Sequence, residues 1–367
     1  MSSATAQMKP RMSFDEAVAA ATAADPYPRY AMQVAAAPFD IAGPGRWIAA
    51  SARAVEHVLL AREFSVSAPP GTFAARTIRR DDGELHARVR PFVESRLAIE
   101  SGEAASRAGA LARALWATTA GSDAARVDAL AEWLPTAAVA AFIGLDPFDR
   151  TIHRSAQMLA RGLAAGAGDV AAALAEEAAA DLWAHVPGNT DDERANAAAL
   201  FAQAHDATAG LIGNTLLALA SDARLAEGVR ADRAALEVAV AETARFDAPV
   251  QNTRRRALAD VVVLGHEVHA GDIVLVLLAA ANRDPAANDD PARFAIDRPN
   301  RRCFTFGAGM HACPGKQLAI AIASAGVACV LGARTDLVQL ARGASYQPSL
   351  NARIPRFSEA ASRFPPS

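Results

Sequence analysis

A glycine-rich loop with a single cysteine, FGAGMHACPG at 306–315, leads directly into the apolar run KQLAIAIA. Pro314 follows the cysteine, which favours a helix with proline in its first position. The free N–H groups from Gly315 onward are expected to point toward the Cys313 sulfur, and together with the helix dipole they favour a thiolate. Gly309 and Gly315 leave room for a flat group to approach the backbone closely. A soft anionic ligand in this setting suits iron held in a macrocycle.

Two other interpretations of Cys313 stay open from the residues alone. The first is an inert buried cysteine in a loop that happens to contain glycines. The second is a zinc site shared with Cys303 and His311, but the spacing is unlike that of a zinc knuckle and no second pair of ligands is evident. The sequence has only three cysteines, the third being Cys329. This low, odd number argues against a disulfide framework and indicates a reducing compartment.

Composition and charge exclude several classes of protein. The 367 residues are 52% hydrophobic, and 37 basic side chains nearly balance 40 acidic ones for a net charge of −3. Neither nucleic acid nor an anionic membrane is therefore expected as a partner. The N-terminus lacks the apolar core of a signal peptide, and no apolar run approaches the length of a membrane span, about 18 residues. We expect a soluble, cytoplasmic protein, and the alanine richness indicates a bacterial source.

Hydrophobic periodicity predicts a mainly helical chain. Ser13 and Glu16 form a capping-box pattern that opens a short helix to about Ala24. A strand is expected at 46–50, and Ser51 can cap another helix directly after it. The expected helices beyond the first are 52–60, most of 84–139, 164–183, 200–220, 234–246 and 314–331. The stretch at 200–220 is apolar on most faces, so it is expected to be a central buried helix.

Short strands with tight turns are predicted at 261–264, 267–269 and 273–278, because the hydrophobic period changes there. The stretch at 282–303 is rich in proline, aspartate and asparagine, which predicts an irregular loop, and the tail is expected to hold a small hairpin. We find no internal repeat and no linker that divides the chain. The sequence therefore predicts a disordered lead-in over 1–12, followed by one large, mainly α domain with minor β sheets over 13–367.

Four positions of the cysteine loop have a fixed spacing: Phe306, Gly309, Cys313 and Gly315. This spacing, with a helix directly after it, resembles the haem-binding signature of the cytochrome P-450 family, in its soluble bacterial type. The resemblance implies that haem b (iron protoporphyrin IX) lies between a long central helix and the helix after the cysteine. It implies that Cys313 is the axial ligand of the iron. Phe306, Gly307, Gly309 and Gly315 are then the loop residues around the cofactor.

Several cationic groups are implied to bind the haem propionates. His86 and Arg90 lie one helical turn apart and share a helix face, which suits a pair of carboxylates. The resemblance assigns them to the propionates. It adds His311, two residues before the cysteine, and either Arg254 or Arg255.

Glu242 and Arg245 lie three residues apart on a predicted helix and can pair on one face. Alone, they could be an ordinary surface pair. In the family that the chain resembles, such a pair is joined by an arginine from the loop before the cysteine and stabilises the core behind the haem. Arg293 is the expected third member here, and Arg298 is a second candidate.

The predicted central helix carries a polar group in an apolar setting, and such a group needs a partner. By resemblance, Asp206 takes the place of the family's acid, whose role is in catalysis; the alternative is that it merely pairs with a nearby arginine. Ala204 stands where the family has glycine, and Ala207 stands where it has threonine, with Thr208 in the next position. The missing threonine is the main departure from the family pattern. Proton delivery would then run through Asp206, Thr208 and water, or a substrate hydroxyl would supply the missing contact.

The resemblance implies a monooxygenase that activates dioxygen and oxidises, most simply hydroxylates, a small organic substrate of the kind found in secondary metabolism. Electrons would come from a separate ferredoxin or flavodoxin. The segments around 65–83 and 145–199 are short for the family, which implies a small substrate lid. Two alternatives stay open: haem-thiolate chemistry without hydroxylation or with peroxide as oxidant, and a non-enzymatic haem sensor.

Overall fold

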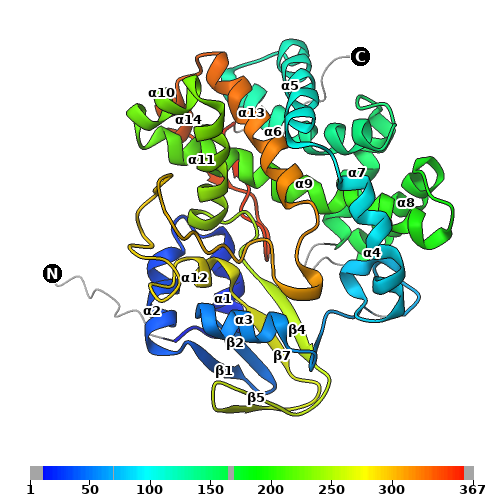
Figure 1. The fold of residues 1–367 in the computed structure, drawn as a ribbon, viewed down its shortest axis with the longest axis vertical. Coiled ribbons are helices and arrows are strands. Elements are labelled where there is room, and N and C mark those ends of the chain that lie inside the picture. Colours follow the sequence, from blue (N-terminus) through cyan, green and yellow to red (C-terminus); the bar gives the residue numbers. More distant parts are fainter. Residues whose placement is uncertain (1–10, 69, 164–168, 359–367) are drawn as a thin grey trace.

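Helices make up most of the protein, and a small sheet lies at one end of the molecule (Figure 1). The computed structural model describes residues 11–68, 70–163 and 169–358. Residues 1–10 of the predicted lead-in over 1–12 lie outside the described residues. For Met12 the prediction is wrong, because this side chain is buried and its backbone N–H donates to Gln33 Oε1 at 2.7 Å.

The N-terminal elements form where local signals predict them. The capping box of Ser13 and Glu16 is present and opens α1 (Phe14–Ala19), which a 3-10 turn extends to Thr22. The Ser51 hydroxyl accepts from Ala54 N–H and caps α3 (Ala52–Leu60), as predicted. These ends are set by side chains a few residues away, so the sequence is enough to find them.

The main sheet has five strands in the order β1-β2-β7-β4-β3. Their bounds are Phe39–Gly43, Arg46–Ala49, Ile273–Val276, Thr253–Ala257 and Phe64–Ser65. β2 and β7 are parallel, and the other neighbours are antiparallel. The predicted strands near 46–50 and 273–278 are confirmed. Strand β4 was missed because its sequence, TRRRA, has no apolar alternation, although Arg255 and Ala257 are buried on it.

The predicted helical stretches are confirmed as α4 (Glu84–Leu97), α5 (Ser101–Thr118), α6 (Asp123–Phe142), α8 (Asp169–His185) and α11 (Arg233–Phe246). For α8, residues 164–168 of the prediction lie outside the described residues. The elements for which no separate prediction was made are α2 (Tyr27–Ala36), α7 (Arg150–Leu163), α10 (Ala223–Ala231), α12 (Leu278–Asn282) and α14 (Leu337–Arg342). The predicted turn strands are β5 (Val261–Val263) and β6 (His266–Val268), and the tail hairpin is β8 (Ser345–Tyr346) with β9 (Pro355–Arg356).

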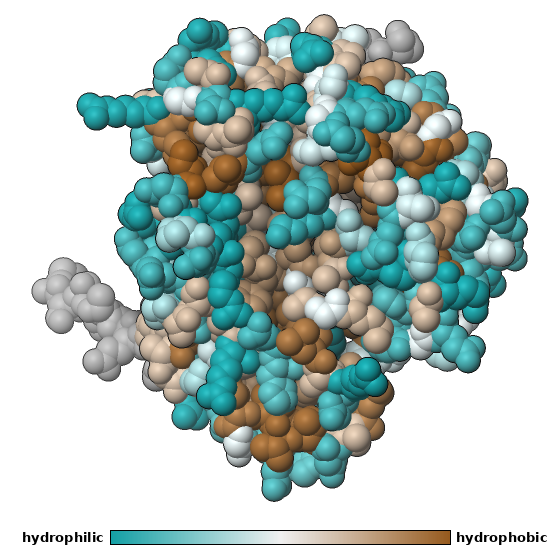
Figure 2. Space-filling view, viewed as in Figure 1, coloured by the Kyte–Doolittle hydropathy of each residue, from teal (hydrophilic) through white to brown (hydrophobic). Residues whose placement is uncertain are grey.

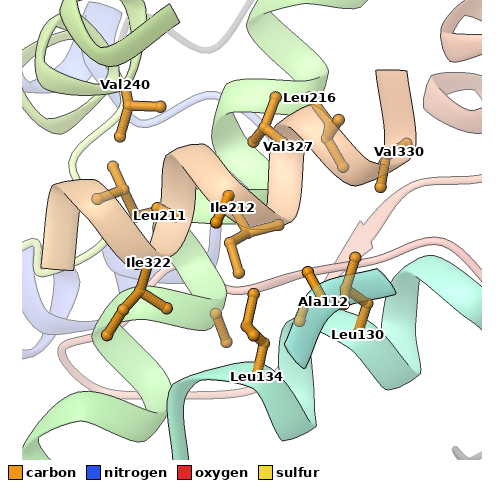
Figure 3. Close-up of a cluster of buried hydrophobic side chains, with 14 of the residues drawn as sticks. Ala112, Leu130, Leu134, Leu211, Ile212, Leu216, Val240, Ile322, Val327 and Val330 are labelled. Atoms are coloured by element: carbon orange, nitrogen blue, oxygen red, sulfur yellow. The ribbon is translucent and has the colours of Figure 1, made fainter. Parts of the chain in front are cut away.

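Helices α9 (Asp191–Ala220) and α13 (Lys316–Gly332) pack against each other in the centre of the helical part. Figure 3 shows Leu211 and Ile212 of α9 beside Ile322 and Val327 of α13, with α5 and α6 next to them. A Cβ at Gly326 would lie 3.1 Å from Ile212 and Leu134 side-chain carbons, so this glycine permits the close approach. The central helix is confirmed, but it starts at Asp191, where Thr190 caps it.

One segment of the described chain, Gly309–Gly332, is long and apolar enough to cross a membrane by composition, with a mean hydropathy of 1.5. The prediction that no run approaches this length is therefore wrong. Because 61% of its most apolar window is buried inside the protein, the segment has the character of a core helix. Figure 2 shows mainly polar residues over one face, with apolar residues at the sheet end, where Leu258 and Val262 are exposed.

Candidate functional site

A cavity of about 330 Å³ lies between α9 and the cysteine loop. It brings together most residues that the sequence singled out. Those lining it are Asp206, Ala207, Thr208, Cys313, His86, Arg90, Arg255, His311, Phe306, Gly307 and Gly315. Arg254 and Gly309 are not among the lining residues. Segments that are far apart in the sequence therefore supply one site, as the resemblance implied.

The cysteine loop is held by its own backbone. The N–H of Cys313 donates to Phe306 O at 2.8 Å, and the N–H of Gly307 donates to Phe304 O at 2.8 Å. Gly307 and Gly309 have φ values of +68° and +65°, which favour glycine. A Cβ at Gly309 would also lie 3.0 Å from Leu60 Cδ2. Its small size thus serves packing against α3, and the expectation that it makes room for a flat group stays a prediction.

Helix α13 begins two residues later than predicted. Gly315 is its N-cap and Lys316 its first residue, so Pro314 precedes the helix instead of filling its first position. The N–H of Gly315 does donate to the Cys313 sulfur, as expected. The proline thus ends the loop, and the cap residue provides the sulfur's hydrogen bond.

Cys313 presents a free, exposed thiol to the cavity. Burial raises the pKa of this thiol, although the Gly315 N–H and the charges of Arg90 and Lys316 lower it. The Gly315 N–H thus favours the thiolate, as expected, but desolvation outweighs it in the direction of the pKa shift. A coordinating metal deprotonates its thiol directly, so the donor chemistry still fits haem iron.

His86 and His311 form the edge of the cavity beside the sulfur. Their ring centroids are 5.1 Å apart, and His86 Nε2 is buried with no hydrogen-bond partner in the described part of the protein. Burial lowers the pKa of His86, and the nearby His311 and Arg90 lower it further. His311 Nε2 lies 2.7 Å from Asp82 Oδ1. An orphaned buried ring nitrogen facing a cavity fits an acceptor such as a propionate.

The two arginine alternatives on β4 are separated by strand alternation. Arg255 is buried and lines the cavity, where burial lowers its pKa to about 10. The guanidinium of Arg254 lies over the Phe14 ring, 5.8 Å from its centroid. Arg254 therefore faces away from the cavity, since neighbouring side chains of a strand point to opposite sides.

Arg90 lines the cavity from α4 and is held by two contacts. Its Nε donates to Glu94 Oε1 at 2.6 Å, and its Nη1 donates to Met310 O at 3.4 Å. The helical spacing brings Arg90 and His86 to the same cavity, as predicted.

Asp206 has a partner of its own on α9. Its Oδ1 lies 2.7 Å from His205 Nδ1, and 36% of its side chain is exposed. The expectation of a partner is thus confirmed, but the partner is a histidine. Ala207 and Thr208 also line the cavity. The residue directly after Asp206 therefore offers only a methyl group, and the next hydroxyl along the helix is that of Thr208.

Glu242 and Arg245 form a buried two-bond pair. Arg245 Nε donates to Glu242 Oε2 at 3.0 Å and Nη2 donates to Oε1 at 2.7 Å, and both side chains are fully buried. Arg298 Nε donates to Glu242 Oε1 at 3.2 Å, and Arg301 Nε donates to Oε2 at 2.9 Å. Arg298 is therefore the member supplied by the loop, joined by Arg301, which the sequence analysis missed.

The prediction of Arg293 as third member is wrong. Its side chain is largely exposed and pairs with Asp290 at 3.4 Å, while only its backbone O accepts from Arg245. The irregular loop lacks a repeating geometry, so spacing could not choose among its arginines.

The zinc alternative finds no support in the described residues, which hold no group of three His, Cys, Asp or Glu side chains able to bind a metal. Cys303 packs against the core around α13, and burial raises the pKa of its thiol. Two further cavity residues, Arg79 and Arg80, were missed because they lie in a short 3-10 turn with no motif.

Comparison with known proteins supports the resemblance to the cytochrome P450 family. A sequence model described as "Cytochrome P450" matches residues 191–333. The chain also resembles the crystal structure of Mycobacterium smegmatis CYP164A2 in its ligand-free state, with a TM-score of 0.76 and 26% identity over 93% of this chain and 97% of that one. Residues 191–333 thus match the cytochrome P450 family, and the fold of the described residues is that of a cytochrome P450 structure.

Curated P450 relatives match only part of the chain. Cytochrome P450 107B1 of Saccharopolyspora erythraea is 39% identical over 121 residues, which is 33% of this chain and 30% of that protein. The 20-oxo-5-O-mycaminosyltylactone 23-monooxygenase of Streptomyces fradiae is 38% identical over 124 residues, 34% of this chain and 30% of that enzyme. The matches thus span under a third of these relatives' length. The match to the P450 family implies haem, and the cavity residues fit it.

Proposed function

We propose that this P450 is a haem-thiolate monooxygenase that hydroxylates a small organic substrate with dioxygen and electrons from a separate redox partner. The observation that carries the proposal is the free Cys313 thiol in a cavity that Asp206 of α9 also lines. The Streptomyces fradiae relative is named as a monooxygenase, which supports this class of reaction.

Haem b is proposed to be held at both its metal and its edge. Cys313 Sγ would bind the iron, with Phe306, Gly307 and Gly315 around it. The free Nε2 of His86 and the guanidinium groups of Arg90 and Arg255 would donate to the propionates, with His311 beside them. When bound, thiolate-ligated haem supplies the activation of dioxygen and the insertion of one oxygen atom into a C–H bond.

The protein's own contribution is to supply protons and exclude bulk water. Asp206 is open to the cavity and can exchange a proton there, while His205 fixes its orientation through the 2.7 Å contact. Thr208, the residue after Ala207, offers a hydroxyl to the cavity. Because Ala207 has no hydroxyl of its own, the proposed proton route runs through Asp206, Thr208 and water.

The substrate, partner and location are proposed from the same features. The described residues of the segment at 65–83 include the end of β3 and two short 3-10 turns, and those of 145–199 include α7, α8 and the start of α9, which fits a small lid over a small cavity. A ferredoxin or flavodoxin is proposed as electron donor, in the cytoplasm, with a substrate from secondary metabolism.

The test is the absorption spectrum of the ferrous–carbon monoxide adduct, followed by turnover with a reductase system and dioxygen. A red-shifted thiolate-type band and one oxygen atom from labelled dioxygen in the product are expected. A colourless protein, or a band without the shift, contradicts the proposal. Because Ala207 stands where the family has threonine, a peroxide-dependent enzyme is the second candidate. Turnover with hydrogen peroxide, without the reductase system, is the assay for it.

Replacing Ala207 with threonine is expected to change the coupling of electron use to product. The added hydroxyl would stand in the cavity beside Asp206 and provide a second route for a proton. The expected change is on the order of tenfold, below the roughly 10²–10⁴-fold of a sole general acid, because Asp206 already supplies one route. Coupling is measured as product formed per reducing equivalent consumed. Ala218→Thr, on the same helix but outside the cavity, is the matched control. An unchanged ratio in Ala207→Thr would argue against this role.

A further inference from the structure

Arg79 is a cation without a partner inside the P450 cavity. It belongs to the 3-10 turn Ile78–Arg80, in the segment that connects the sheet to α4 (Figure 1). Its side chain lines the cavity and is open to it. No hydrogen bond or ion pair joins it to another residue in the described part of the chain. By contrast, Arg90 pairs with Glu94, and Arg80 donates to Val66 O at 3.4 Å.

The surroundings of Arg79 make this isolation unfavourable. Burial lowers its pKa to about 10, and the charges of Arg80 and Arg255 lower it further, while Asp206 raises it. The side chain of Arg79 is exposed toward the cavity, so an anion that enters there can pair with the guanidinium. Asp206 does not fill this role, because its Oδ1 already contacts His205 and no pair within 4.0 Å joins it to Arg79 in the described residues.

Arg79 and Arg255 line the same cavity, and the charge of Arg255 lowers the pKa of Arg79. Asp82, which contacts His311 of the cysteine loop, raises the pKa of Arg255, so Arg255 belongs with the groups assigned to the propionates. The turn that carries Arg79 is attached to α9, because the N–H of Ile78 donates to Asn196 Oδ1 at 2.8 Å. Asp206 of the same helix raises the pKa of Arg79. Arg79 is therefore assigned to the α9 side of the cavity, where the substrate is proposed to bind.

We propose that Arg79 is a specificity-determining residue that binds the carboxylate of an anionic substrate. This inference rests on the proposed function and names its substrate class: a small organic molecule with one carboxylate and an apolar body. The planar guanidinium matches a carboxylate with two parallel hydrogen bonds. The apolar body would contact Val139, Leu163 and Leu200, which line the same cavity.

Two matched pairs of probes test the proposal: n-octanoate with octanamide, and hydrocinnamate with hydrocinnamamide. Each pair differs in charge but little in shape. The haem-loaded protein is titrated, and Kd is measured from the Soret absorption change and, independently, by calorimetry. Each carboxylate is expected to bind about tenfold more tightly than its amide, or about 1.4 kcal/mol. Arg79→Gln is expected to abolish this preference, and Arg79→Lys to retain part of it.

The control is Arg76→Gln, in the neighbouring 3-10 turn, whose side chain lies over Trp183 outside the cavity. It is expected to leave the preference unchanged. Equal affinities for carboxylate and amide in the unsubstituted protein, or no binding of either, overturn the proposal. So does loss of haem from Arg79→Gln that Arg79→Lys restores, because Arg79 would then hold the cofactor. The carbon monoxide spectrum is recorded first, so a failure of the haem-thiolate assignment is seen separately.

Discussion

Replacing Cys313 with alanine is expected to abolish the thiolate-type carbon monoxide band and to lower turnover by on the order of 10³-fold or more, as when the group that does the chemistry is removed. Cys313 is the one cysteine among the residues lining the cavity between α9 and the cysteine loop. The variant keeps the residues proposed to bind the haem propionates but has no sulfur to bind the iron. Haem content, the spectrum and turnover are measured on the same preparation.

The matched control is Cys329→Ala, near the other end of α13. Its thiol packs against the helical core and does not line the cavity. It is expected to keep the spectrum and turnover of the unsubstituted protein. A thiolate-type band that persists in Cys313→Ala would refute the assignment of the axial ligand.

Replacing Glu242 with alanine is expected to destabilise the protein by about 3–5 kcal/mol, the range for breaking a buried pair. Glu242 accepts from Arg245, Arg298 and Arg301, and its removal leaves the fully buried Arg245 without an anion. Denaturant unfolding followed by circular dichroism measures the loss. Glu237→Ala on the same helix removes a partly exposed pair with Arg233, and a change within about 0.5 kcal/mol is expected. Equal losses in the two variants would contradict this role.

The same carboxylate predicts a direction for the pH dependence of stability. Burial alone would raise the pKa of Glu242, but the hydrogen bonds and charge of Arg245, with Ala295 N–H and Arg301, lower it below its usual 4.5. A folded-state pKa below the unfolded one contributes stability above about 4.5 that is lost as pH falls through the folded value. Acid unfolding is expected to show this loss in the unsubstituted protein and less of it in Glu242→Ala.

Local signals predicted those parts of the fold that depend on neighbouring residues. The Ser13 box, the Ser51 cap and the helix over 234–246 are set within a few residues, so they could be found without a structure. Strand β4 could not, because its arginines are stabilised by sheet pairing and the cavity wall. The start of α13 was misplaced because the tight loop around Gly307 and Gly309 continues through Pro314.

For the site, the motif predicted which types of group meet at one cavity, including His86, Arg90 and Cys313. It could not choose between Arg254 and Arg255, because the choice depends on which face of a strand each side chain takes. Nor could it choose Arg298 and Arg301 over Arg293, because an irregular loop has no fixed period. No sequence pattern pointed to Arg79, because its proposed role follows from its place in the cavity and from its having no hydrogen bond or ion pair among the described residues.

The sequence by itself determined the family, the helical class and the cysteine that faces the cavity, because motif spacing and helix periodicity act over short stretches of chain. Only the tertiary structure decided how that cysteine is held and what surrounds it. Burial, more than the helix start, sets the pKa of the Cys313 thiol. Contacts between segments far apart in the chain decide which arginines are paired, and such contacts follow from packing of the whole molecule.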